Sequence, residues 1–379
     1  MKLTILQNKL KDGLNIVEKI SAKSPTLPIL SNVLLKTEKN FLELSATDLE
    51  IGIRFWILSK TEKEGGIAIP AQILSSYIGM LSPSPIKIET KQGNLLFESD
   101  NIKTQVKGNN PEDFPIVPQV KDGEVISLSA KSTCQGLSQL VGICSPSTIR
   151  PEISGVFLSI QKNLLKIAAT DSFRLGEKQI ILKKPLSISK EYSLILPQKA
   201  ANHLISIFGQ EEEFKVFLSP NLLMFESQIE EVEHPKIQFV SKLIEGEFPK
   251  YEEIIPKSYK TEAEIQKGEF LKQLKTAGIF AGRINEVKIG FDEKAQQIRI
   301  FCQNPELGEH SSTLSAKIKG KDSEVSFNYK FLLDGLANIE ASEVFFALSK
   351  EKEGEEGPAI LKPIGDESYL YVVMPFQES

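Results

Sequence analysis

Residues 169–175 read Ala-Thr-Asp-Ser-Phe-Arg-Leu and follow the alternating apolar run 164–168. The alternation predicts a strand, and the small polar residues predict the turn that ends it. A lone Arg174 between the apolar Phe173 and Leu175 is more typical of a docking surface at a strand end than of a catalytic site.

The same pattern occurs elsewhere in the chain. Residues 46–50 read Ala-Thr-Asp-Leu-Glu after the strand-like run 41–44, and the two Thr-Asp pairs are 123 residues apart. A more divergent copy, Phe-Cys-Gln-Asn-Pro, stands at residues 301–305. These spacings predict one structural unit that is used three times.

The composition is that of an ordinary globular chain. It has 379 residues, 41% of them apolar and 25% charged, and a net charge of −5. This charge argues against a uniform attraction to nucleic acid but is compatible with a local basic surface. The three cysteines form no CxxC pair and the three histidines have no metal-ligand spacing, so no disulfide framework, metal or cofactor is expected. A reducing cytoplasm is therefore predicted, and the polar start predicts no signal peptide.

Six amphipathic helices, two in each unit, are predicted from the spacing of apolar residues, with about eight short strands per unit. Their ranges are 7–20, 70–82, 129–143, 197–208, 267–283 and 328–339. The helix charges sum to +6, so the rest of the chain carries −11. Positively biased helices on an acidic body suit a surface that faces a polyanion. Ordinary solvated helix faces are the alternative explanation of the same lysines.

The stretch 65–86 carries no charge, which raises the alternative of a membrane span. It contains three prolines and several polar residues, so a buried helix with turns at both ends is predicted instead.

Five motifs together make the sequence similar to the β sliding clamp family, the processivity subunits of bacterial DNA polymerase III. They follow the family's order along the chain: Pro-Thr-Leu-Pro-Ile-Leu at 25–30, Thr-Asp-Leu-Glu at 47–50, Ala-Thr-Asp with Arg-Leu at 169–175, Phe-Pro-Lys-Tyr at 248–251, and Tyr-Val-Val-Met-Pro at 371–375.

The resemblance implies an α+β fold of three tandem clamp-type (DNA clamp) domains, at residues 1–121, 122–252 and 253–379, and a ring-shaped head-to-tail homodimer. Such a ring encircles duplex DNA and slides along it without reading its sequence. It tethers the polymerase III α subunit, the clamp loader and other proteins that carry a clamp-binding motif. No catalytic site is implied.

The resemblance also implies a partner groove between the second and third domains. The matching residues are Ile153, Thr170, Ser172, Phe173, Arg174, Leu175, Pro249, Ile254, Val372, Met374, Pro375 and Phe376. An apolar cleft with one arginine suits a short peptide with aliphatic or aromatic anchors. Ordinary core packing is the alternative for the apolar members, whereas an unpaired buried arginine is costly.

Three groove positions depart from the family pattern. Glu253, Phe173 and Phe376 stand where the family often has Arg, His and Met. The groove rim is therefore predicted to be more acidic and more aromatic than is usual, with a different peptide preference.

The predicted DNA-facing residues are Lys23, Arg150, Lys199, Lys272 and Lys275. Arg150 and Lys199 match family positions near the central hole, whereas Lys272 and Lys275 are chosen from helix charge alone.

The family closes its ring with an apolar contact on the first helix of the third domain, here Ile279 and Phe280. The opposite surface is the edge strand of the first domain near Thr104 and Val106. An unpaired strand edge is a natural site for such pairing.

Two other functions are open at this point. A hydrolase would use Asp171 with Thr170, although no nucleophile elbow, P-loop or dinucleotide fingerprint accompanies them. Asp48 repeats Asp171 in another unit, which favours a structural turn. A repeat scaffold that never meets DNA is the second alternative.

Overall fold

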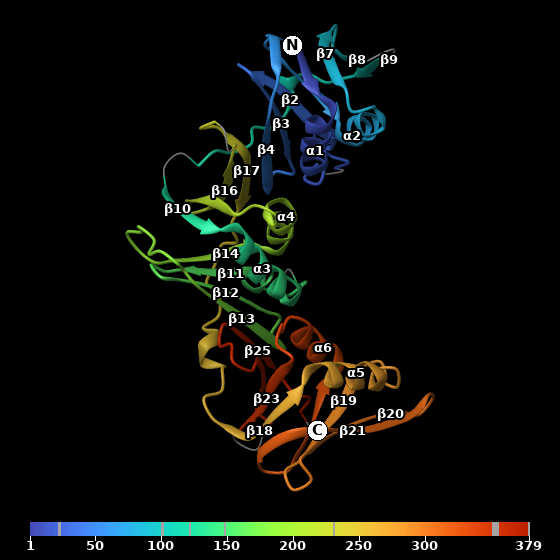
Figure 1. Ribbon diagram of the computed structural model, residues 1–379, viewed down its shortest axis with the longest axis vertical. Coiled ribbons are helices and arrows are strands. Elements are labelled where there is room, and N and C mark those ends of the chain that lie inside the picture. The colour runs from blue at the N-terminus through green and yellow to red at the C-terminus, as the bar shows by residue number, and fades with distance from the viewer. Residues whose placement is uncertain are drawn as a thin grey trace. The chain divides into compact units, whose positions relative to one another are not determined.

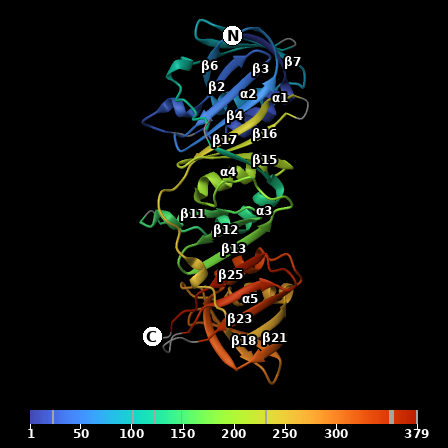
Figure 2. The same cartoon turned by 90° about the vertical axis from the view of Figure 1, so that its left-hand side faces the viewer.

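The computed structural model describes residues 1–21, 24–99, 102–120, 123–147, 149–229, 232–350 and 356–377. The chain forms two compact units. Unit 1 comprises residues 1–135, 184–190 and 199–244, and unit 2 comprises residues 136–183, 191–198 and 245–379. Figure 1 labels the elements, and Figure 2 shows them after a quarter turn.

The same order of elements occurs three times, except that the first repeat has one additional strand, β5. The first repeat has β1 (Lys2–Leu6), α1 (Gln7–Val17), β2 (Asn32–Glu38), β3 (Phe41–Thr47), β4 (Ile51–Leu58), β5 (Lys60–Lys63), β6 (Gly66–Pro70), α2 (Ala71–Met80), β7 (Pro85–Lys91), β8 (Asn94–Ser99) and β9 (Ile102–Lys107). The second has β10 (Glu124–Ser129), α3 (Ala130–Leu140), β11 (Gly155–Ile160), β12 (Leu164–Thr170), β13 (Arg174–Ile181), β14 (Tyr192–Pro197), α4 (Gln198–Phe208), β15 (Glu213–Leu218), β16 (Leu222–Gln228) and β17 (Pro235–Lys242). The third has β18 (Tyr259–Gln266), α5 (Lys267–Ala277), β19 (Glu286–Asp292), β20 (Gln297–Asn304), β21 (Gly308–Gly320), β22 (Ser323–Asn328), α6 (Tyr329–Ala337), β23 (Glu343–Ser349), β24 (Ala359–Pro363) and β25 (Tyr369–Val373). The predicted α+β unit of two helices and about eight strands is therefore present three times.

Sheets continue from one repeat into the next. Unit 1 has a sheet of order β5-β1-β7-β8-β9 and a sheet of order β10-β15-β16-β17-β4-β3-β2-β6. In the second of these, β17 of the middle repeat pairs antiparallel with β4 of the first, with Ser241 opposite Ile51. Unit 2 has one sheet of order β14-β11-β12-β13-β25-β24-β23-β18-β21-β20-β19-β22, in which β13 pairs with β25 and Arg174 is opposite Val373. The middle repeat is therefore divided between the two units, because its strands are hydrogen-bonded to both neighbouring repeats.

The helices pack through the apolar faces that the sequence predicts. In unit 1, α1 contacts α2, β3 and β4 (Figure 1), and its Leu10, Leu14 and Val17 have no exposed surface. On α2, Leu74 and Ile78 are equally buried. Burying a side chain of this size stabilises the fold by roughly 1.5–3 kcal/mol. The uncharged stretch 65–86 thus contains a helix, as predicted, but only one face of it is buried, since Ile73 and Met80 are exposed. Among the described residues, the search for a membrane-spanning helix finds no candidate.

The helix prediction for residues 267–283 is wrong at its end. The helix α5 stops at Ala277, where the amide of Gly278 bonds back to the carbonyl of Leu274, and two glycines close together disfavour a further turn. Ile279 and Phe280 therefore lie in the turns after α5 and not on it. The other five helices agree with their predicted ranges to within three residues.

We predict that Gly335→Ala destabilises unit 2. A Cβ at this position of α6 would lie 2.5 Å from the ring of Tyr371, which is fully buried and cannot move aside cheaply. The expected cost is about 1–3 kcal/mol, measured as a lower unfolding midpoint in calorimetry. Gly79→Ala in α2 is the matched control, because nothing lies within 4 Å of its added Cβ. A midpoint that falls equally in both variants would contradict this packing.

Candidate functional site

The Thr-Asp turn after β12 is held by its own side chains. The Asp171 Oδ1 atom accepts the amides of Phe173 and Arg174, each at 3.0 Å, and the Thr170 hydroxyl donates to the Arg174 carbonyl at 2.8 Å. Ser172 takes the left-handed conformation, with φ of 78°. This is the geometry of an Asx turn, which short polar side chains support.

The first repeat builds the same turn after β3. The Asp48 Oδ1 atom accepts the amides of Glu50 and Ile51, the Thr47 hydroxyl donates to the Ile51 carbonyl, and Leu49 has φ of 77°. In the third repeat, Asn304 Oδ1 accepts the amide of Glu306. The internal repeat therefore extends to individual hydrogen bonds, which favours the structural role of Asp171 over the hydrolase alternative.

Arg174 begins β13, and its guanidinium is already occupied. It donates to Asp171 Oδ2 at 3.0 Å, to Asp334 of α6 and to the Gly142 carbonyl at 3.3 Å, and it lies 4.5 Å from the centre of the Phe331 ring. Its side chain is only 10% exposed. Burial alone lowers the pKa of Arg174, but the facing Tyr371 and the two carboxylates raise it overall, so the charge persists. Arg174 thus joins the middle repeat to α6, and little of it is available to a ligand.

Beside this pair of strands lies an apolar cluster with one buried polar pair. Leu175 and Val372 are opposite each other on β13 and β25 and pack with Tyr251 and Ile360. The Tyr251 hydroxyl donates to Glu177 at 2.5 Å. Burial, followed by this carboxylate, raises the pKa of Tyr251, because both disfavour the phenolate.

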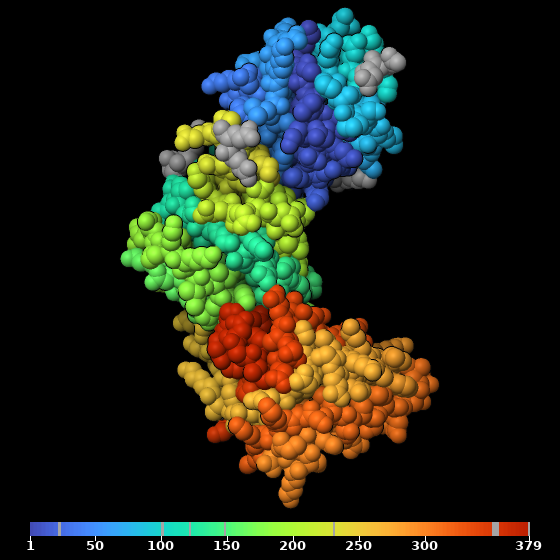
Figure 3. All heavy atoms as spheres, in the orientation of Figure 1, coloured from blue at the N-terminus to red at the C-terminus, as the bar shows by residue number. Residues whose placement is uncertain are grey.

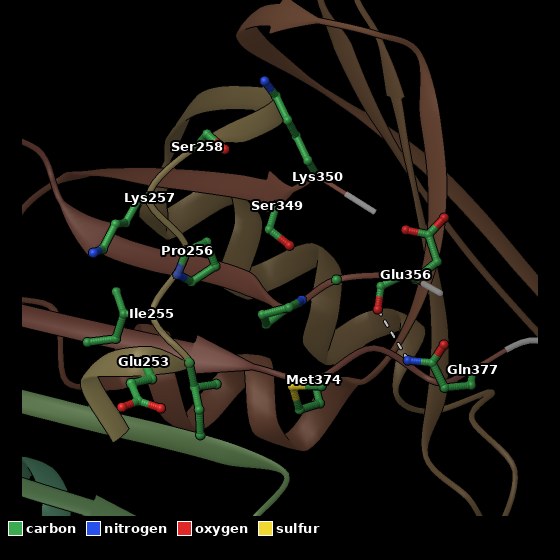
Figure 4. Close-up of a pocket in the computed structure, with 13 residues that line it drawn as sticks. Glu253, Ile255, Pro256, Lys257, Ser258, Ser349, Lys350, Glu356, Met374 and Gln377 are labelled. Carbon is green, nitrogen blue, oxygen red and sulfur yellow. Dashed lines mark hydrogen bonds between the residues drawn. The ribbon is translucent and has the colours of Figure 1, made fainter. Parts of the chain in front are cut away.

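A cavity of about 560 Å³ opens next to Met374 in unit 2 (Figure 4). Its walls come from residues 253–258, Ser349, Lys350, residues 356–358, Met374 and Gln377. The Ser349 hydroxyl is buried and has no hydrogen-bond partner among the described residues. The walls therefore combine apolar residues, such as Ile254 and Met374, with at least as many polar or charged ones, among them Glu253, Lys257 and Glu356.

The structure places some of the predicted groove residues at or next to this cavity. Phe173 accepts a bond from the Met374 amide at 2.9 Å, and Phe173 is 64% exposed. Ile254 and Met374 line the cavity. The remaining predicted residues differ in burial: Thr170, Pro249 and Phe376 are half-buried, Ser172 is exposed, and Ile153, Leu175, Val372 and Pro375 are buried.

Several cavity residues are absent from the prediction. Residues 255–258 lie a few positions after the Phe-Pro-Lys-Tyr motif at 248–251, so this motif is the sequence feature nearest to them. No sequence pattern points to Ser349, Lys350 or the residues of α6 that hold Arg174. The departure Glu253 does lie on the cavity wall.

The predicted DNA-facing residues have different surroundings. Lys23 lies outside the described residues. Arg150 donates to Glu152 at 3.0 Å and to Ser172 at 3.2 Å, so its position favours the groove rim over a phosphate contact. Lys199 forms an ion pair with Asp48.

The two α5 lysines are exposed, on a helix at the surface of unit 2 (Figure 3). No ion pair found among the described residues includes Lys272 or Lys275. Both are placed to meet an anion from solvent.

The predicted closure surfaces both have open strand edges. Thr104 and Val106 lie on β9, which ends its sheet and pairs only with β8. Ile279 is 67% exposed, and the ring of Phe280 stacks on His310 of β21. The first half of β21, residues 308–315, pairs only with β20.

No catalytic or metal constellation accompanies these surfaces in the described chain. Both carboxylate oxygens of Asp171 are engaged in structural bonds. No group of three or more His, Cys, Asp or Glu side chains, as far as the structure describes them, is placed to hold a metal ion. Burial raises the pKa of Cys134 and of Cys144 to about 12, so neither thiol is an activated nucleophile.

Comparison with known families gives three matches in chain order. Residues 1–118 match the model of the DNA polymerase III beta subunit, N-terminal domain. Residues 137–250 match the central domain, and residues 252–377 match the C-terminal domain, of the same subunit.

Full-length relatives and solved structures agree with these matches. The chain is 28% identical over 393 residues to a beta sliding clamp of Staphylococcus aureus, covering 100% of this chain and 99% of the relative. It is 25% identical over 384 residues to a beta sliding clamp of Synechococcus elongatus, with the same coverage. The fold is similar to that of the Bacillus subtilis DNA polymerase sliding clamp, with a TM-score of 0.91, 24% identity and full coverage of both chains. The DNA polymerase III subunit beta of Pseudomonas aeruginosa gives a TM-score of 0.91 at 23% identity, covering 99% of this chain and 100% of that one.

We predict that Arg174→Met destabilises unit 2 by about 1–3 kcal/mol, because Asp171 loses a partner in a nearly buried site. Phe173→Ala next to it is the control, and its exposed side chain should change stability by less than about 0.5 kcal/mol. Urea unfolding of both variants measures the difference. An Arg174→Met variant as stable as the wild type would show that the guanidinium is not a structural group.

Proposed function

The chain belongs to the DNA polymerase III beta subunit family, the sliding clamps of bacterial replication, and we propose that two copies close head to tail around duplex DNA. The ring slides along DNA and holds the replicative polymerase on its template. The observation that carries this proposal is the threefold unit, matched in family order from the first residues to the last. The clamp has no catalytic role of its own, and it works in the cytoplasm, where its DNA is.

Encirclement explains how such a protein works without tight binding. A closed ring leaves DNA only when it opens or reaches an end. Contacts to phosphates then need only be weak and independent of sequence, since strong contacts would slow sliding. Lys199 on α4 and Lys272 and Lys275 on α5 would supply this contact, with Lys23 as a further predicted contact outside the described residues.

Ring closure would use the two open strand edges. In a head-to-tail dimer, β9 of one copy meets residues 308–315 of β21 in the other, and the strand pairing continues across the interface. The exposed Ile279 and the neighbouring Phe280 would bury apolar surface against Thr104 and Val106 beside that edge.

The partner site is the groove around Met374. Short peptides of the polymerase III α subunit, the clamp loader and other proteins with a clamp-binding motif would insert aliphatic or aromatic side chains there. Because Arg174 is occupied, apolar contacts of Phe173, Ile254 and Met374 would supply most of the affinity. Arg150 and Glu253 would act at the rim.

We predict that Ile279→Asp with Phe280→Asp gives monomers, because two carboxylates would have to be buried in the dimer contact. Sedimentation measures the oligomeric state. The wild type, loaded on a nicked circular duplex, should remain bound through gel filtration and leave when the circle is cut, whereas the variant should not be retained.

Ile181→Asp is the control for this experiment, because Ile181 is exposed and lies on β13, a strand that is part of neither proposed closure surface. It should behave as the wild type. A wild type that remains on linear DNA with open ends would exclude a topological link, and a dimeric double variant would exclude this closure surface.

We predict that Phe173→Ala with Met374→Ala weakens binding of the polymerase α subunit by about tenfold or more. Met374 lines the cavity, the exposed Phe173 is bonded through its carbonyl to the Met374 amide, and a truncated anchor typically costs about 1–2 kcal/mol or more. Surface plasmon resonance on immobilised clamp measures the change. Leu49→Ala, at the equivalent turn of the first repeat, is the control and should leave the affinity unchanged. Equal affinity of the double variant and the wild type would remove the partner site from this groove.

A further inference from the structure

The carboxylate of Asp48 has two separate roles. One oxygen holds the turn after β3, at 2.9 Å from the Glu50 amide and 2.7 Å from the Ile51 amide. The other oxygen accepts the Lys199 ammonium. The Asp48 side chain is only 7% exposed, whereas that of Lys199 is 60% exposed, so the pair presents its cation to solvent.

The cation belongs to a small patch formed by two helices. Lys199 stands in the first turn of α4, and His203 follows one turn later, half-buried. Lys19, just after α1, donates to Ser206 of α4 at 2.7 Å, which brings a second exposed ammonium to the same helix. We call Lys19, Lys199 and His203 the α1–α4 patch. Asp48 is the carboxylate that faces it, and burial followed by Lys199 lowers the pKa of His203.

The turn itself does not require a carboxylate. At the corresponding strand end of the third repeat, the amide oxygen of Asn304 accepts one backbone amide, that of Glu306, at 2.9 Å. In the second repeat, the second oxygen of Asp171 is used for the buried Arg174. In the first repeat the equivalent oxygen, Oδ2 of Asp48, accepts a hydrogen bond from the exposed Lys199 instead. The negative charge at position 48 therefore has a purpose beyond the turn.

We propose that Asp48 is a built-in counter-ion that competes with DNA phosphates for Lys199 and so keeps the clamp's grip on duplex DNA weak. This inference rests on the proposed function. Each phosphate that a lysine neutralises adds about 0.9 to the salt dependence of binding, expressed as the slope of log affinity against log salt concentration. A lysine that must first leave a carboxylate adds less. The pair thus lowers the friction of sliding while the lysine remains available.

The test uses the full-length wild type and three single substitutions, with a fluorescein-labelled blunt duplex as the probe. Dissociation constants are measured by anisotropy over a series of NaCl concentrations. Asp48→Asn keeps the turn and releases Lys199, so binding at low salt should be about two- to fivefold tighter, a factor typical of one exposed ion pair. The slope should steepen by up to about one.

Two further single variants and one double variant make this result specific. Lys199→Ala should weaken binding, and in its background Asp48→Asn should have no further effect. Asp292→Asn removes the same charge from another turn, where the Asp292 side chain accepts the Ala295 amide at 2.8 Å. No ion pair found within the described part of the chain includes Asp292. This control should bind DNA as the wild type does.

Three outcomes would overturn the counter-ion role. The first is an Asp48→Asn variant that folds with wild-type DNA affinity and slope. The second is an equal gain in the Lys199→Ala background or in Asp292→Asn, which would indicate net charge alone. The third is a loss of thermal stability in both single variants without a change in binding, which would leave the pair a structural tie. A wild type that shows no salt-dependent binding at all would instead reject the proposed function on which the inference rests.

Discussion

The antiparallel pairing of strands from different repeats is the constraint on which the rest of this structure depends. In unit 1, β4 pairs with β17, and in unit 2, β13 pairs with β25. Both pairings end with an equivalent backbone hydrogen bond of 2.9 Å. In unit 1 the Lys242 amide donates to the Glu50 carbonyl, and in unit 2 the Met374 amide donates to the Phe173 carbonyl. Backbone bonds therefore fix where the chain leaves each sheet. The rim of the proposed partner groove is set by this register before any side chain contributes.

The two junctions share their backbone but not their side chains. At the second junction the turn carries Phe173 and Arg174, and the guanidinium is neutralised by two carboxylates from different elements. At the first junction the corresponding residues are Glu50 and Ile51, and the carboxylate of Asp48 turns to Lys199. A repeated turn thus supplies one spare carboxylate oxygen at each junction, and the surrounding elements determine its use. Divergence of function between the repeats requires only these few substitutions.

Sequence patterns were sufficient for features that depend on neighbouring residues. Apolar spacing located α1 and α2, and the Thr-Asp repeat located both turns. Sequence patterns were insufficient for contacts between residues far apart in the chain. Asp334 is 160 residues from Arg174, and the sequence around neither residue indicates their ion pair. The end of α5 was missed because Gly278 is compatible with a helix until the following turns are known. The groove residues were predicted from the family resemblance alone. No sequence pattern predicted that Ser349 would form part of the cavity wall.

The charges of the proposed DNA surface fit a topological link better than a binding site. Lys199 is engaged by Asp48, whereas the lysines of α5 face solvent without such a partner among the described ion pairs. One of these three described cations is thus already neutralised within the chain. A protein that relied on affinity would gain by exposing all of them, since each contact with a phosphate adds to binding. Partial neutralisation is useful only where another mechanism prevents escape from DNA, and a closed ring provides that mechanism.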